Sequence, residues 1–179
     1  IVELNEKEVR DLCDRHKGIG ADGVMLLLKK EGYDFEMKYY NSDGGEGSMC
    51  GNGGRCLIKF AYQMGIRRTT YRFTALDGEH KGEVDEAGVV RLRMNDVNKV
   101  RTVGNDYILN TGSPHYIKLV GDVSSINVYN EGRAIRNSKE FAAEGINVNF
   151  VSRISDDEIE VRTYERGVED ETLSCGTGV

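Results

Sequence analysis

Two cysteines, Cys50 and Cys175, each directly precede a glycine-rich run, and they lie 125 positions apart in the chain. The runs read Met-Cys-Gly-Asn-Gly-Gly from residue 49 and Ser-Cys-Gly-Thr-Gly from residue 174. A thiol at the start of a helix meets unpaired backbone N–H groups and the positive end of the helix dipole, which stabilise its thiolate. Because neither cysteine belongs to a periodic apolar stripe, we predict that both are reactive.

Two thiols on opposite sides of one carbon atom can invert its configuration. One thiolate removes a proton, the other thiol delivers a proton to the opposite face, and no cofactor takes part. When charge develops on a neighbouring carboxylate, N–H donors must already be aimed at it. The residues placed to supply these donors directly follow the cysteines: Gly51, Asn52, Gly176 and Thr177. The alternative for the glycines is a tight turn alone.

Other uses of the four cysteines fit the spacing less well. Cys50 and Cys56 are separated by five residues, more than in common zinc sites, and the three histidines are scattered, so we predict no metal. A cysteine protease or acyl transferase would leave the second cysteine motif unexplained. Cys13 and Cys56 are interpreted as small buried apolar side chains.

Composition narrows the class of protein. The 179 residues are 39% hydrophobic and 30% charged, which fits one or two compact soluble domains. The net charge of −6 offers no basic surface for nucleic acid, and no apolar run approaches the roughly 20 residues that span a membrane. Few cysteines and no recognisable signal peptide favour the cytoplasm.

The run Gly-Ile-Gly-Ala-Asp-Gly at 18–23 matches a dinucleotide-binding pattern, but its context does not. That pattern needs a strand before it and a helix after it. Here a helix is predicted before it and a strand after it, so nucleotide binding is not expected.

Hydrophobic periodicity predicts alternating helices and strands. A helix is expected over 6–16, a buried strand over 24–28 and a half-buried strand over 35–40. A second helix begins just after Cys50, with an apolar stripe of Leu57, Phe60, Ala61 and Met64. Further strands are expected at 71–75, 80–84, 89–94, 107–110, 115–119, 146–151 and 159–164, with a polar connection over 95–104, a helix over 131–137 and another helix starting after Cys175.

Strand, turn-rich loop, cysteine and helix thus occur twice, which indicates an internally duplicated α+β protein. We expect two pseudo-symmetric lobes with mostly antiparallel or mixed sheets, an N-terminal lobe over 1–95 and a C-terminal lobe over 96–179. Because a helix should be starting where the sequence ends, and a helix begins close to its first residue, we interpret the chain as lacking both termini.

Several ordered motifs resemble the diaminopimelate epimerase family. They are residues 15–23, 40–45, 49–56, 164–167 and 171–178, and they extend over nearly the whole chain. The resemblance implies a cofactor-independent epimerase that interconverts LL- and meso-diaminopimelate in lysine and cell-wall precursor synthesis. It also implies a homodimer, and two lobes, each with a sheet around a central helix, that close over the substrate in a cleft.

The resemblance also implies roles for individual residues. Cys50 and Cys175 match the two acid/base thiols, and His115, assisted by Glu165, matches a group that adjusts a thiol pKa. The residues that match substrate-binding positions are Asn41, Asn52, Asn147, Glu165 and Arg166. The arginine fits a carboxylate clamp and the glutamate an ammonium contact.

The chain also departs from the family pattern. Ser113 stands before Pro-His where many members have asparagine, which implies a shorter-reaching or water-mediated contact to substrate. Gly23 occupies a position that can be polar in relatives, and the N-terminal Gly-x-Gly-Asn-Asp-Phe segment, which contributes a binding asparagine, is missing; an incomplete pocket is therefore expected. The alternative functions are a racemase or epimerase of another amino acid with the same fold, and a non-catalytic amino-acid-binding or thiol-switch relative.

Overall fold

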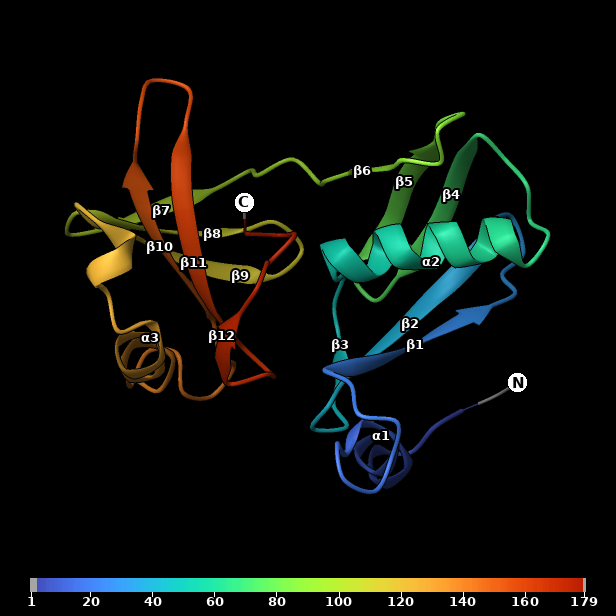
Figure 1. Ribbon diagram of the computed structural model, residues 1–179, viewed down its shortest axis with the longest axis horizontal. Coiled ribbons are helices and arrows are strands. Elements are labelled where there is room, and N and C mark those ends of the chain that lie inside the picture. Colours follow the sequence, from blue (N-terminus) through green and yellow to red (C-terminus); the bar gives the residue numbers. More distant parts are fainter. Residues whose placement is uncertain (1–2, 179) are drawn as a thin grey trace. The chain divides into compact units, whose positions relative to one another are not determined.

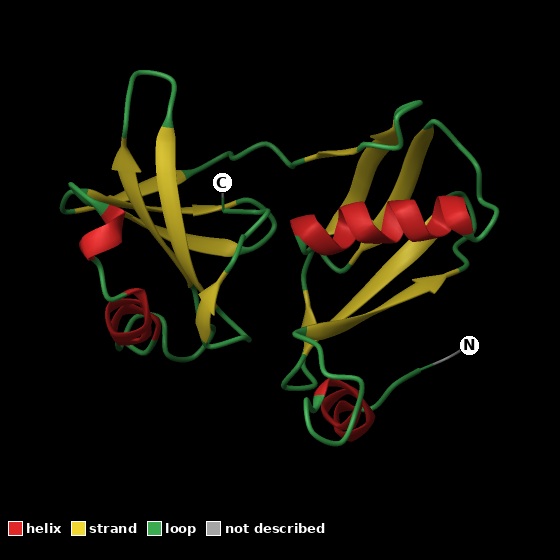
Figure 2. Ribbon diagram, in the orientation of Figure 1, coloured by secondary structure: helices red, strands yellow, loops and turns green. Residues whose placement is uncertain are grey.

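A computed structural model describes residues 3–178 of the chain. The chain forms two compact units, Ile1–Asn95 (unit 1) and Asp96–Val179 (unit 2), and each is built on a six-stranded sheet (Figure 1). Helices pack against strands in both units (Figure 2), so the α+β class expected from the sequence is confirmed.

Unit 1 contains the first half of the elements. In chain order they are α1 (Glu6–Cys13), β1 (Gly23–Leu28), β2 (Phe35–Asn41), β3 (Glu46–Gly47), α2 (Gly51–Gln63), β4 (Thr70–Ala75), β5 (Gly78–Val84) and β6 (Val90–Arg93). The sheet order is β1-β2-β4-β5-β6, with β3 also paired to β2. The β2–β4 pair is parallel, because α2 connects the two strands, and the other pairs are antiparallel.

The sheet of unit 1 is covered on both faces. Phe35 and Met37 of β2 belong to the core under α2, whereas Tyr40 belongs to a separate cluster with Val9 and Cys13 of α1. We predicted that only one face of β2 is buried. That prediction is wrong at Tyr40, which is 6% exposed because α1 covers it. The strand β1, expected to be buried, is half-buried throughout.

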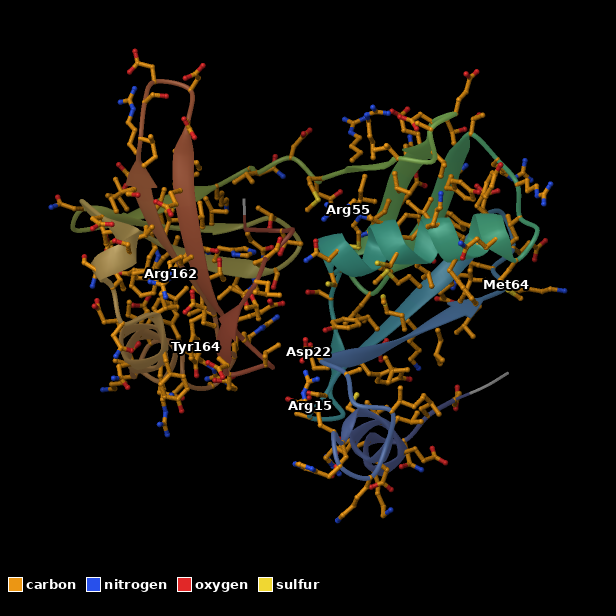
Figure 3. All side chains as sticks on the ribbon, in the orientation of Figure 1. Arg15, Asp22, Arg55, Met64, Arg162 and Tyr164 are labelled. Carbon is orange, nitrogen blue, oxygen red and sulfur yellow. The ribbon has the colours of Figure 1, made fainter. Side chains whose placement is uncertain are left out.

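Two predictions about helices of unit 1 need correction. Helix α1 ends at Cys13, earlier than expected, because Asp14 is extended and its carboxylate accepts the N–H groups of His16 and Lys17. The loop that follows leads into a strand, and an ion pair of 2.6 Å joins Arg15 to Asp22 across it (Figure 3). The order helix, loop, strand agrees with the expectation for this glycine-rich run.

The buried face of α2 differs from the predicted stripe. Leu57 and Ala61 are buried as expected, but Phe60 is 47% and Met64 66% exposed, and Ile58 is fully buried instead. Ile58 faces the sheet at Gly82, where an added Cβ would lie 2.4 Å from the Ile58 Cδ1 atom. This rotation of the helix leaves Cys56 exposed, which corrects its interpretation as a buried residue.

Unit 2 repeats the plan with different connections. Its elements are β7 (Val100–Val103), β8 (Asp106–Asn110), β9 (Pro114–Leu119), a 3-10 helix (Val123–Ser125), α3 (Val128–Arg136), β10 (Asn147–Arg153), β11 (Ile159–Glu165) and β12 (Asp170–Thr172). The sheet order is β12-β11-β10-β9-β8-β7, and the β9–β10 pair is parallel. Strands β7 and β12 were not expected: β7 is a mostly exposed strand without apolar alternation, and β12 has three residues.

The two units share one local register. Val24 of β1 faces Tyr40 of β2, and Val148 of β10 faces Tyr164 of β11. Each tyrosine also pairs with a glutamate on the next strand: Tyr40 with Glu46 of β3, and Tyr164 with Glu171 of β12. Cys50 follows β3 in the chain, and Cys175 follows β12. The segment α1-β1-β2-β3-Cys50 therefore corresponds to α3-β10-β11-β12-Cys175, which confirms the duplication. A helix was expected to start after Cys175, but Gly176 and Thr177 form a turn there; residue 179 lies outside the described residues.

Candidate functional site

Cys50 is the N-cap residue of α2. Its backbone is extended, with φ −104° and ψ 116°, and the Gly53 N–H donates to the Cys50 Sγ atom at 3.4 Å. An added Cβ at Gly53 would lie 2.6 Å from the Met25 sulfur, so a larger residue there would displace the Met25 side chain of β1. The first turn of α2 thus directs N–H donors and a helix dipole at a half-buried thiol.

The other predicted site residues of unit 1 lie near the ends of elements. Gly51 is the first residue of α2, and Asn52 follows it, its side-chain oxygen accepting from Arg55. Asn41 is the last residue of β2, and its backbone bonds with Gly45 and Gly44 close the turn toward β3. Asn41 therefore lies at the end of β2, and the chain continues from there through β3 to Cys50.

Cys175 lies in a turn after β12 and is 4% exposed. The Gly178 N–H donates to the Cys175 carbonyl at 3.1 Å, and Gly176 occupies the turn. The Thr111 hydroxyl donates to the Thr177 carbonyl at 2.7 Å and so ties this turn to the loop before β9. Both cysteines are free thiols.

Opposing influences act on the Cys175 thiol. Burial, and then the nearby Glu165 carboxylate, raise the pKa of Cys175 above its ordinary value. Hydrogen bonds from the Thr177 hydroxyl and from the Thr177 and Gly178 N–H groups act in the opposite direction. The result is a thiol that holds its proton in the substrate-free protein, with donors in place for a thiolate.

Ser113, Asn147 and Arg166 are joined by hydrogen bonds. The Asn147 amide donates to the Ser113 Oγ atom at 3.1 Å and accepts the Arg166 backbone N–H at 2.8 Å. The Arg166 guanidinium donates to the Glu144 carbonyl at 2.9 Å and reaches Ser113 at 3.5 Å. An added Cβ at Gly145 would lie 2.6 Å from the arginine Cδ atom, so that glycine makes room for the side chain.

The positive charge and the N–H donors of Arg166 suit recognition of a carboxylate. Its pKa is lowered from its usual value, by burial and then by the neighbouring Arg136, but a guanidinium remains charged at any physiological pH. A half-buried arginine with fixed backbone contacts offers a planar pair of N–H donors to a carboxylate ligand.

His115 is fully buried in this region of unit 2. Its Nε2 atom lies 3.1 Å from the Thr177 Oγ1 atom, and Thr177 Oγ1 lies 3.6 Å from the Cys175 sulfur. Burial, and then the charge of Arg166, lower the pKa of His115 from 6.5 to about 4, so the ring is neutral at pH 7. His115 therefore approaches the thiol through a hydroxyl group and as an uncharged ring.

Two polar residues of this site were missed from the sequence. Asn149 and Thr163 are 0% and 3% exposed; the Asn149 amide lies 3.0 Å from the His115 ring, and the Thr163 hydroxyl donates to the Asn149 oxygen. Strand alternation was the available signal: Asn149 lies two positions after Asn147, and Thr163 two positions before Glu165. Figure 3 labels Arg162 and Tyr164, whose side chains lie on the opposite face of β11.

Two further features of the described residues concern metal ligands and membrane spans. Among residues 3–178, no group of three or more His, Cys, Asp and Glu side chains is arranged to hold a metal ion. In the same part of the chain, no helix has the length and apolarity needed to cross a membrane.

Solved structures with a similar fold define the class. The chain aligns with a phenazine biosynthesis protein of the PhzF family from Bacillus anthracis at a TM-score of 0.68 and 14% identity, covering 96% of this chain and 67% of that one. It aligns with a hydroxyproline epimerase from Agrobacterium vitis at a TM-score of 0.64 and 16% identity, covering 88% and 58%. At these identities the likeness establishes the fold, a two-lobed α+β architecture.

The chain belongs to the diaminopimelate epimerase family, whose model matches residues 2–100 and 107–179. It is 48% identical to a diaminopimelate epimerase from Flavobacterium psychrophilum, covering 97% of this chain and 68% of that protein. It is 45% identical to one from Chlorobaculum tepidum, covering 99% and 72%. An epimerase is an isomerase, so the protein is an enzyme of that class.

Proposed function

We propose that the protein interconverts LL- and meso-diaminopimelate without a cofactor, using Cys50 and Cys175 as an acid/base pair. The observation that carries the proposal is that each unit supplies a cysteine whose sulfur lies within hydrogen-bond distance of a polar group: the Gly53 N–H at 3.4 Å in unit 1, and the Thr177 hydroxyl at 3.6 Å in unit 2. Membership of the diaminopimelate epimerase family supports the substrate.

The two thiols have different surroundings, which suggests a resting protonation state. The Cys175 thiol is buried beside Glu165 and keeps its proton, whereas the Cys50 sulfur caps a helix N-terminus, which favours negative charge. In the proposed reaction the Cys50 thiolate removes the α-proton of one epimer, and the Cys175 thiol delivers its proton to the other face. The reaction of the opposite epimer requires Cys175 as the thiolate and Cys50 as the thiol.

The remaining predicted residues are proposed to bind the substrate. Arg166, held by Asn147 and Ser113, suits a carboxylate, and Glu165 suits an ammonium group. The N–H groups after each cysteine, including those of Gly51 and Gly176, are proposed to stabilise charge on the carboxylate next to the reacting carbon. Asn41 and Asn52 complete the proposed set with amides that donate and accept.

The first test is α-proton exchange. Reduced protein is incubated with stereochemically pure LL-diaminopimelate in heavy water, and exchange is followed by NMR and chiral analysis. Deuterium incorporation together with meso product supports the proposal. Binding without exchange would identify an amino-acid-binding relative, and absence of binding would point to another substrate.

Substitution of each thiol tests the two-base assignment. In Cys50→Ser and Cys175→Ser, turnover should fall by about 100-fold or more, because a serine hydroxyl is too weakly acidic to replace a thiol acid or base. Cys56→Ser is the matched control, since Cys56 is exposed on α2 and outside the proposed site. Near-normal turnover in either of the first two variants would contradict the assignment.

Localisation and assembly are part of the same proposal. Four free thiols suit a reducing compartment, and we propose the cytoplasm. A homodimer is proposed from the family resemblance, and sedimentation equilibrium of the reduced protein is the measurement that decides it.

A further inference from the structure

A row of buried polar groups crosses the sheet of unit 2 behind the Cys175 turn. His115 on β9, Asn149 on β10 and Thr163 on β11 are each at most 3% exposed. Val148 and Phe150, which alternate with Asn149, belong to the apolar core on the other face. Buried polar side chains are costly unless each finds a partner, so their hydrogen bonds are restricted to few arrangements.

The orientation of the Asn149 amide follows from its neighbours. One end of the amide lies 3.4 Å from the Tyr116 carbonyl oxygen, which can only accept a hydrogen bond, so that end must be the NH₂ group. The other end is then the oxygen, and the Thr163 hydroxyl donates to it at 2.9 Å. Asn149 is therefore held from both sides in one orientation.

The amide in turn determines which nitrogen of His115 carries the proton. The Asn149 Nδ2 atom lies 3.0 Å from His115 Nδ1, and since the amide NH₂ donates, Nδ1 must accept. In a neutral imidazole the other nitrogen then carries the hydrogen. The Nε2–H group points to the Thr177 hydroxyl oxygen at 3.1 Å.

The direction of this bond sets the direction of the next. Because the Thr177 oxygen accepts from His115, its own hydroxyl hydrogen is free for the Cys175 sulfur, 3.6 Å away. An added Cβ at Gly178 would lie 2.5 Å from the Asn149 oxygen and 2.9 Å from the histidine ring, so the turn packs closely on the row.

We propose that Asn149 is a positioning residue that holds neutral His115 in its Nε2–H tautomer, so that His115, through Thr177, directs a hydroxyl hydrogen at the Cys175 sulfur. The row thereby stabilises the thiolate form of the buried Cys175 through neutral groups alone. The consequence for proton transfer rests on the proposed function. The tautomer and the effect on Cys175 do not require the protein to be an epimerase.

The tautomer can be measured directly by long-range ¹H–¹⁵N NMR of the reduced protein. The chain has three histidines, and the His115 signals are identified by their loss in His115→Gln. We expect a protonated Nε2 and an unprotonated Nδ1 at pH 6–8. In Asn149→Asp the carboxylate can only accept, so Nδ1 should become protonated. An Nδ1–H tautomer or an imidazolium in the wild-type protein would overturn the proposal, whether or not the variants fold.

The effect on the thiol is tested by the pH profile of Cys175 alkylation, read by peptide mass spectrometry. In Asn149→Ala the midpoint should rise by roughly half a pH unit to one unit, a threefold to tenfold loss of thiolate below the midpoint. Thr177→Val should show the same rise, Thr177→Ser should not, and combining Asn149→Ala with Thr177→Val should add nothing further. The charged groups near this row, Arg166 and Glu165, are unchanged in all of these variants.

A purely structural role for Asn149 predicts a different pattern. Ser152→Ala changes another buried polar residue of β10 and serves as the matched control, with no expected change in tautomer or alkylation midpoint. If folded Asn149→Ala also leaves the Cys175 midpoint unchanged, the relay to the sulfur is refuted. Loss of epimerase activity without these shifts would concern the proposed function alone.

Discussion

At the scale of single residues, the two cysteines proposed to react have different hydrogen-bond surroundings. Cys50 caps a helix and receives a hydrogen bond from the first turn of that helix. Cys175 lies in a turn, where a hydroxyl and two backbone N–H groups oppose the effects of burial and of Glu165. Similar motifs in the sequence are therefore compatible with distinct electrostatic surroundings, which suits an acid and a base that must differ before the reaction starts.

The buried His115 makes stability depend on pH. Its pKa is about 4 in the folded protein and near 6.5 when unfolded, so the unfolded chain binds more protons between these values. The stability that the folded protein gains from neutral His115 is fully present above pH 6.5 and is lost as the pH falls toward 4. Relative to His115→Gln, the wild-type free energy of unfolding should fall by about 3 kcal/mol from pH 7 to pH 4, measured by urea titration. Parallel curves for the two proteins would show that His115 is not held neutral.

At the scale of elements, strand alternation separates the core from the site in unit 2. One face of β10 and β11 packs on α3 through Val148, Phe150 and Tyr164, and the other carries Asn147, Asn149 and Thr163. Helix α3 approaches the sheet at Gly132, where the added Cβ would lie 2.3 Å from the Tyr164 Cβ atom. The helix thus packs against β11, the strand that ends at Glu165 and is followed directly by Arg166.

Because Gly132 lies so close to Tyr164, the sign of the stability change in Gly132→Ala tests this packing. Gly132→Ala should destabilise the protein by about 1–3 kcal/mol, because the new methyl group meets the rigid start of the Tyr164 side chain. Helix propensity alone predicts the opposite, a gain of about 1 kcal/mol. Urea unfolding measures the change, and Asn130→Ala, at an exposed position of α3, is the control with little expected effect. A stabilised Gly132→Ala would show that the helix can move away.

At the scale of the whole molecule, the proposed reaction needs a thiol from each compact unit at the same carbon atom. Unit 1 has its own core under α2 and unit 2 its own core under α3, so each can hold its cysteine and binding residues in place. Neither unit alone contains both proposed acid/base groups. The proposed two-base chemistry therefore requires both units.

Substrate protection tests this requirement. Diaminopimelate should slow alkylation of Cys50 and Cys175 in parallel over the same concentration range, because one bound molecule contacts both thiols in the proposed mechanism. Peptide mass spectrometry reports each cysteine separately, and exposed Cys56 should react at an unchanged rate as the internal control. Protection confined to one cysteine would contradict a shared substrate.

The local sequence was enough to predict most elements and the duplicated order, because hydrophobic period, turn residues and caps act within a few positions. Helix α3 shows the limit of this approach. It begins at Val128 rather than 131, because the Asn127 side chain accepts the Asn130 N–H and starts the helix earlier than its apolar pattern indicates. Strand β7 was missed because it is stabilised by pairing with β8 rather than by a buried face.

The sequence by itself determined the family, the duplicated cysteine motifs and the residues proposed for catalysis and binding, because these are properties of residue type and order. Tertiary structure decided which way α2 turns, and hence that Ile58 is buried and Cys56 exposed. It also decided that Asn149 contacts His115 and that Thr163 contacts Asn149, since those contacts join residues on three different strands. The direction of a hydrogen bond depends on all of its neighbours at once, which only the folded chain brings together.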